Sequence, residues 1–282
     1  MKKSLIKGAV FISGVAFISF ILLEKDLTNP WWSLILGLLV NILSAPLYFV
    51  IIEGIYSIGR FKMFFLTKIW YRNQEVRLSI SYLFRIQVKG KYLLVKNRKG
   101  NYYQLVGGAY KALPSAKPLF ARYKITPDRR FQTTGGISKS DLRFMAPGKY
   151  VINMIDWFHS QKDRETSQWR EFCEELLTTN ILDKNLFRYI DYSYATTLMT
   201  PLKKAMGFDY QEILIYEIFD LIPNAQQEAY LENLLQLGDT DEIKWADPVI
   251  INTLGFDERN HHTPYQIGAH TKWAVKEKWS AE

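Results

Sequence analysis

The stretch WREFCEELL, residues 169–177, places three glutamates, Glu171, Glu174 and Glu175, beside Arg170. On a helix, positions i, i+3 and i+4 share a face, so the three carboxylates are expected to converge on one spot. Unpaired carboxylates repel one another, and a hard cation bound through oxygen ligands removes that repulsion. We therefore predict a helix over residues 167–180 whose glutamates hold a divalent metal or pair with basic side chains from elsewhere in the chain.

The segments around this helix predict a mixed fold. Residues 82–111 contain short apolar runs separated by KGK, NRKGN and GG, a pattern typical of strands and tight turns. Residues 210–223 are predicted to form another strand, and residues 225–237 and 264–278 to form helices. Strands and helices in this order favour an α/β sandwich.

The charge is divided unevenly along the chain. Residues 60–150 hold 20 Lys and Arg against three acidic residues, whereas residues 151–282 hold 12 Lys and Arg against 22 Asp and Glu. The basic part indicates a phosphate-bearing partner or an anionic membrane surface, and the acidic part indicates a divalent metal or charge matching between the two parts. An unevenly charged solvated surface is the alternative. The lone cysteine, Cys173, excludes an internal disulfide and is expected to be a small buried hydrophobe rather than a nucleophile.

Two long apolar segments precede the basic part. Residues 4–23 and 31–52 each have the length of a membrane span, and we expect a two-helix transmembrane hairpin. The alternative for the first segment is a secretory signal, but no cleavage site of small residues follows it. Lysines and arginines flank the pair, with a single lysine in the link, so the positive-inside rule predicts a multi-pass inner-membrane protein with both termini cytoplasmic.

The expected organisation therefore has three parts. Residues 1–58 are the hairpin, residues 59–80 a basic juxtamembrane connector, and residues 81–282 the cytosolic domain, with a basic insert at about 111–150.

The string REFCEEL, Arg170 to Leu176, resembles the core of the Nudix box. LVGGAYK, with Gly107 and Gly108, is similar to the glycine pair at the end of the strand in that family. The resemblance implies a Nudix-like α/β/α sandwich with a long insert, and Mg²⁺ held by Glu171, Glu174 and Glu175.

The box also departs from the family pattern. Lys162 stands where the family has a glutamate, Asp156 where it has a glycine, and Leu177 where a glycine ends the helix. The candidates to substitute for the missing glutamate are Glu165 and Asp163, although neither is in register. These departures favour a domain that binds its ligand without hydrolysing it.

Two apolar segments followed by this long-insert domain resemble the SMODS-associated Nudix effectors of bacterial cyclic-oligonucleotide antiphage systems, called CBASS. The segments that carry the resemblance are DLRF at 141–144, WREFCEEL at 169–176 and IGAHTKWAV at 267–275. It implies an effector that binds a cyclic nucleotide made by a nucleotidyltransferase, forms homo-oligomers on activation and disrupts the inner membrane in abortive infection. Its partners would be the nucleotide and membrane lipid, with no DNA or RNA duplex.

A cyclic dinucleotide carries two phosphates and two flat bases, so its site requires cationic and aromatic side chains. The candidate ligand-binding residues are Arg85, Lys111, Arg122, Arg129, Arg130, Arg143 and Tyr103. Further aromatic candidates are Tyr102, Trp157 and Phe158, and His270 is a candidate base contact. The alternative for each is a surface charge or a core side chain.

Two other functions remain open. One is a membrane-tethered Nudix hydrolase that cleaves a nucleoside diphosphate-linked substrate with a divalent metal. The other is an anchored adaptor whose basic surface binds anionic lipid.

Overall fold

The computed structural model describes residues 60, 62–97, 100–130, 140–258 and 260–280 of the 282-residue chain. The chain divides into two compact units, Met1–Phe65 and Leu66–Glu282. The fold below is that of the second unit.

The described residues of this unit form a seven-stranded sheet and a four-stranded sheet. The larger sheet has the order β6-β7-β1-β10-β8, with β5 also pairing with β1 and β9 with β10. Its strands are β1 (Glu75–Arg85), β5 (Val106–Ala109), β6 (Thr126–Pro127), β7 (Arg143–Pro147), β8 (Asp191–Met199), β9 (Lys203–Lys204) and β10 (Gln211–Ile222). The smaller sheet contains β2 (Gln87–Val88), β3 (Lys91–Lys96), β4 (Tyr103–Gln104) and β11 (Ile243–Ala246).

Strand β1 is the centre of the larger sheet. All of its residues between the two ends are buried, because helices and loops cover both faces. The sequence EVRLSISYLFR is accordingly mostly uncharged. It pairs in parallel with β10, from Val76 opposite Gln211 to Arg85 opposite Asp220. On its other edge it pairs antiparallel with β5 and with β7.

Strands β5 and β7 share this edge, and the stretches that they pair with meet at Ile80 of β1. The Ile80 N–H donates to the Leu142 carbonyl at 2.9 Å, and the Tyr110 N–H donates to the Ile80 carbonyl at 3.1 Å. Beyond this point the chain runs from Lys111 into the insert and returns at Asp141, which forms a β-bridge with Lys111. The insert therefore begins and ends at the middle of the central strand.

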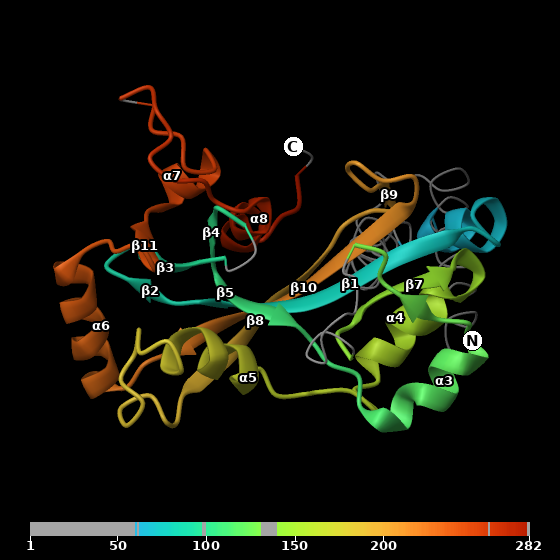
Figure 1. Ribbon diagram of the computed structural model, residues 1–282, viewed down its shortest axis with the longest axis horizontal. Helices are drawn as coiled ribbons and strands as arrows, with labels where there is room; N and C mark the ends of the chain where they lie inside the picture. The colour runs from blue at the N-terminus through green and yellow to red at the C-terminus, as the bar shows by residue number, and fades with distance from the viewer. Residues whose placement is uncertain (1–59, 61, 98–99, 131–139, 259, 281–282) are drawn as a thin grey trace, which may run out of the picture. The chain divides into compact units, whose positions relative to one another are not determined.

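Helices cover both sides of the larger sheet. Figure 1 shows α8 (Ala269–Lys276) on one side of β1 and β10, and α4 (Val151–His159) and α5 (Trp169–Phe172) on the other. The remaining helices are η1 (Leu66–Trp70), η2 (Pro114–Ala116), α3 (Lys117–Arg122), η3 (Gly148–Tyr150), η4 (Cys173–Leu177), α6 (Ala225–Leu237) and α7 (Pro248–Asn252). A buried cluster that includes Leu83 of β1, Leu94 of β3 and Trp273 of α8 joins the two sheets.

Several predicted elements form as the sequence indicates. The strand predicted over 210–223 is β10, and the helix predicted over 225–237 is α6, which begins at a capping box between Asn224 and Gln227. The helix predicted over 167–180 begins later, as α5, and continues as the π-helix η4. Its N-cap is Gln168, and the Ser167 hydroxyl accepts from the Trp169 N–H at 3.2 Å.

The mixed α/β fold is consistent with the Nudix-like prediction, but the membrane part of that prediction is corrected. Among the residues that the structure describes, no helix has the length and apolar character needed to cross a membrane. The longest of them, α6, has 13 residues, whereas a span takes about 20. The predicted fold class with a membrane hairpin and the predicted multi-pass inner-membrane location are therefore both contradicted. The segments behind that prediction, residues 4–23 and 31–52, lie outside the described residues.

Candidate functional site

Arg170 organises the segment that resembles the Nudix box. Its Nε and Nη2 atoms donate to the two carboxylate oxygens of Glu165, at 3.0 and 3.1 Å. Nη2 also donates to the Ala109 carbonyl at 2.8 Å, and Nη1 pairs with Glu171. Glu165 in turn accepts from the Lys111 N–H at 3.2 Å. The guanidinium thus links the helix that carries Glu171, Glu174 and Glu175, which we call the glutamate helix, to the end of β5. Glu165 provides the carboxylate that the Nudix box lacks at the position of Lys162.

The glutamates lie against the glycine pair. A side chain at Gly108 would meet the Glu171 carboxylate, because a Cβ built there would lie 2.3 Å from Glu171 Cδ. Glu175 accepts from the Gly107 N–H at 2.8 Å. Burial raises the pKa of Glu171, and the adjacent Arg170 cation opposes that rise. Two of the three carboxylates therefore serve the packing of the helix on β5.

The predicted metal set does not fit a preformed site. In the part of the chain that the structure describes, no group of three or more His, Cys, Asp or Glu side chains is arranged to hold a metal ion. Arg170 contacts Glu171 and lies 3.7 Å from Glu174, so a cation of the protein itself already stands among the carboxylates. Metal binding by Glu171, Glu174 and Glu175 stays a prediction.

A pocket of about 540 Å³ lies in the basic insert, and we call it the insert pocket. Every residue that lines it belongs to the basic insert: Ala112, Leu113, Pro114, Ala116, Lys117, Phe120, Ile125, Thr126, Pro127, Asp128, Ser140, Asp141, Arg143 and Phe144. Its volume falls within the range of about 300–1,000 Å³ that is usual for small-molecule sites.

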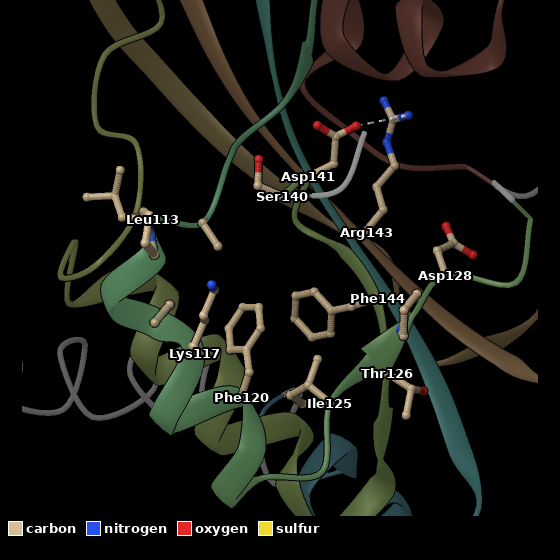
Figure 2. Close-up of a pocket in the computed structure, with 14 residues that line it drawn as sticks. Leu113, Lys117, Phe120, Ile125, Thr126, Asp128, Ser140, Asp141, Arg143 and Phe144 are labelled. Atoms are coloured by element: carbon tan, nitrogen blue, oxygen red, sulfur yellow. Dashed lines mark ion pairs between the residues drawn. The ribbon is translucent and has the colours of Figure 1, made fainter. Parts of the chain in front are cut away.

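Aromatic rings and a few charges shape the insert pocket. Figure 2 shows the rings of Phe120 and Phe144 next to each other, with the Lys117 side chain beside them. The two ring centroids are 5.6 Å apart. The Arg143 guanidinium points away from the rings and lies 3.8 Å from the Asp141 carboxylate. The pocket therefore combines an aromatic wall with two cationic and two acidic side chains in its lining.

Of the residues predicted to bind ligand, Arg143 alone lines the insert pocket. Arg85, at the end of β1, pairs instead with Asp220 at 2.6 Å and with Glu277 at 2.7 Å. Tyr103 is buried in β4, and its hydroxyl donates to the Asp241 carbonyl at 2.9 Å. Both residues hold the fold together at positions away from the insert.

The other basic candidates lie on different sides of the insert. Lys111 forms a backbone β-bridge with Asp141. Arg122 is exposed at the end of α3, against the Tyr123 ring. Arg129 is exposed and pairs with Glu75. Arg130 packs over the Phe208 ring at 4.6 Å and lies 3.1 Å from Glu212. The structure does not bring these cations together in one hollow.

The sequence analysis missed Lys117, Phe120 and Phe144 as pocket residues. Phe144 stands in DLRF, a segment that carries the family resemblance, so that motif already contained the signal. Lys117 and Phe120 lie three positions apart on α3, which places both on one face of the helix. In the sequence they have no marker beyond this spacing.

The chain matches the family model described as the SMODS-associated NUDIX domain over residues 75–275, which run from the first residue of β1 to the end of α8. No curated protein matches the chain.

Proposed function

Since the chain belongs to the family of SMODS-associated Nudix domains, we propose that this domain is the sensor of a bacterial antiphage effector and that it binds a cyclic oligonucleotide. The nucleotide would be made by a nucleotidyltransferase on infection, and binding would promote self-association of the effector. Recognition, rather than hydrolysis, is the role proposed for the Nudix-like fold.

The observation that carries the proposal is the insert pocket. It has the size of a small-molecule site, and it is built wholly from the insert that separates this chain from a plain Nudix box. A nucleobase offers a flat face, which stacks on aromatic side chains such as Phe120 and Phe144. A phosphodiester offers anionic oxygens, which charge-assisted hydrogen bonds from Arg143 or Lys117 would satisfy.

The number of cations is consistent with a small ligand. Arg143 and Lys117 line the pocket, while Asp128 is tied to Arg77 and Asp141 lies beside Arg143. A duplex or a long strand would require a continuous basic surface. A cyclic nucleotide carries few phosphates, which two cations beside an aromatic wall would contact.

The contacts of Arg170 support binding without hydrolysis. Hydrolysis of a pyrophosphate link at this helix would require carboxylates free to hold metal. Here Glu165 and Glu171 pair with Arg170, and Glu175 accepts from a backbone N–H. If the domain were a hydrolase, the full-length protein with Mg²⁺ would release phosphate or nucleotide from nucleoside diphosphate derivatives, and Glu174→Gln would abolish the release.

Titration calorimetry of the purified full-length protein against cyclic di- and trinucleotides tests the proposal. We expect at least one to bind, and we expect Arg143→Met to weaken binding by about tenfold or more, as for a lost hydrogen bond to a charged group. Arg122→Met is the matched control, because Arg122 lies in the same insert outside the pocket. Absence of binding across the panel, or equal effects of the two variants, would contradict the proposal.

A further inference from the structure

The face of the larger sheet beneath α8 brings Arg143 close to a set of aromatic rings. Arg143 of β7 lies opposite Ser79 of β1, and Ser81 of β1 lies opposite Tyr216 of β10. Directly paired residues, and residues two apart on a strand, share a face, so Arg143, Ser79, Ser81 and Tyr216 lie on the same side of the sheet. In the register of the sheet, Ser79 and Ser81 lie between the arginine and the tyrosine.

His270 and Tyr102 complete this set over the same face. The His270 ring lies parallel to the Tyr216 ring, with an interplanar angle of 10° and centroids 5.9 Å apart. The Tyr102 ring meets His270 edge-on at 6.4 Å. Gly268 permits this approach, because a Cβ there would lie 2.7 Å from His270 Cε1 and 3.1 Å from Tyr102 Cε2. We call Tyr102, Tyr216 and His270 the aromatic cluster.

The aromatic cluster is apolar in character but not closed. Each of its three residues is only partly buried, and Tyr216 also packs against the core cluster that joins the two sheets. Burial, and secondarily the charge of Arg143, lower the pKa of His270 to about 4, so the imidazole is neutral at pH 7. Burial raises the pKa of Tyr216 to about 12, so this ring is also neutral. The cluster thus offers uncharged π-faces beside one cation.

We propose that the aromatic cluster is a second subsite of the sensor, which stacks a nucleobase of the ligand while Arg143 binds the phosphate that joins it to the rest. This inference rests on the proposed function. The guanidinium of Arg143 points away from Phe120 and Phe144 in the insert pocket, as Figure 2 shows, and it acts electrostatically on Tyr102, Tyr216 and His270. Three contacts define the ligand class: one base in the insert pocket, a phosphate at Arg143 and a second base on the aromatic cluster. That class is a cyclic nucleotide with at least two bases, and cyclic mononucleotides fill only half of the site.

The test compares two ligands on four forms of the full-length protein. The ligands are the tightest cyclic dinucleotide found for the wild type and the cyclic mononucleotide of one of its bases. The forms are wild type, Tyr102→Leu, His270→Leu and the matched control Tyr265→Leu. Tyr265 is also a half-buried tyrosine in edge-on aromatic contact, but it packs on Tyr103.

We expect Tyr102→Leu and His270→Leu to weaken dinucleotide binding by about 5- to 150-fold, which corresponds to one stacked base. The affinity for the mononucleotide should remain unchanged in both variants, and Tyr265→Leu should alter neither affinity. If His270→Leu fails to fold, Tyr102→Leu and Gly268→Ala, which displaces both rings, carry the same test.

The failures can be told apart. If the wild type binds no cyclic nucleotide, the proposed function fails, and the subsite fails with it. If the wild type binds a cyclic dinucleotide as tightly as Tyr102→Leu does, the subsite alone is overturned. A wild type that binds the mononucleotide as tightly as the dinucleotide would overturn it as well.

Discussion

Arg77 and Asp128 form an ion pair in which both side chains are almost completely buried. Arg77 Nη2 lies 2.8 Å from Asp128 Oδ2, and the two side chains are 4% and 3% exposed. Arg77 also pairs with Glu212 at 3.2 Å. Because Asp128 belongs to the insert and lines its pocket, while Arg77 and Glu212 lie on the central strands, this network fastens the insert to the sheet.

We predict that Asp128→Asn lowers the free energy of unfolding by about 3 kcal/mol or more, because it leaves the Arg77 charge only partly compensated in a buried position. Chemical denaturation of the full-length protein measures the loss. Glu75→Gln is the control, since Glu75 pairs with the exposed Arg129 and should cost less than about 1 kcal/mol. Equal costs for the two variants would show that the buried network does not stabilise the fold.

Arg85 is predicted to act on stability and not on ligand binding. Its Nε and Nη2 atoms donate to both oxygens of Asp220, at 2.6 and 2.7 Å, and Nη1 bonds Glu277, just after α8. Asp220 and Glu277 are partly exposed, so Arg85→Met should cost only about 1–2 kcal/mol. Hydrogen exchange should locate the loss at α8. If Arg85→Met weakened nucleotide binding and left hydrogen exchange unchanged, Arg85 would belong to the ligand site after all.

Gly107→Ala should be far more costly than Gly90→Ala. Both glycines have positive φ, at 151° and 81°. A Cβ at Gly107 would lie 2.1 Å from the Tyr82 carbonyl oxygen, whereas nothing lies within 4 Å of one at Gly90. We expect at least about 3 kcal/mol for Gly107→Ala, since backbone must move, against about 1–2 kcal/mol for Gly90→Ala. Thermal unfolding compares them, and similar midpoints would contradict the close approach.

Glu165 should matter more than Glu174 for holding the glutamate helix. Glu165 accepts two hydrogen bonds from Arg170 and is 17% exposed, whereas Glu174 is 46% exposed and lies 3.7 Å from the same guanidinium. Glu165→Gln is expected to cost about 1–3 kcal/mol, and Glu174→Gln less than about 0.5 kcal/mol. Urea midpoints decide between them, and a reversed order would mean that Glu174 is the main partner of Arg170.

Stability should fall as the pH is lowered from about 6.5 to 4. The pKa of His270 is lowered to about 4 in the fold, so the unfolded chain binds a proton at a higher pH than the folded chain does. The effect is absent above pH 7, develops as the pH falls and is complete below the folded pKa. For a half-buried imidazole we expect a loss of about 2 kcal/mol.

His270→Phe isolates this contribution, because phenylalanine keeps a ring and does not titrate. The raised pKa of Glu171 acts in the opposite direction at acidic pH, so the difference between wild type and variant is the informative quantity. If both proteins lose stability equally between pH 7 and 4, His270 is not the responsible group.

The elements that the sequence predicts well are those with strong local patterns. Helix α6 has an Asn224 cap with Gln227 three residues later, and β10 is a long apolar run, so both formed where expected. The turn of π-helix at Cys173–Leu177 was not predicted, because the residues of WREFCEELL suit an ordinary α-helix equally well.

The arginines that belong to the candidate site were harder to predict, because other arginines form ion pairs with residues far away in the sequence. Arg85 finds Asp220, and Arg77 finds Glu212, each 135 residues further along the chain. No local sequence pattern indicates which arginine will form such an ion pair. Conversely, Phe120 becomes a wall of the insert pocket only because the chain returns at Phe144, and composition alone cannot distinguish such a ring from a core residue.

The parallel pairing of β1 with β10 also sets the order of events during synthesis. The central strand of the larger sheet waits for a neighbour that lies 135 residues further on, so most of the domain must leave the ribosome before the two can meet. Until β10 has been synthesised, β1 lacks the strand that pairs with its second edge. We expect the nascent chain to depend on chaperones in this interval, and truncated chains that end before Gln211 to aggregate.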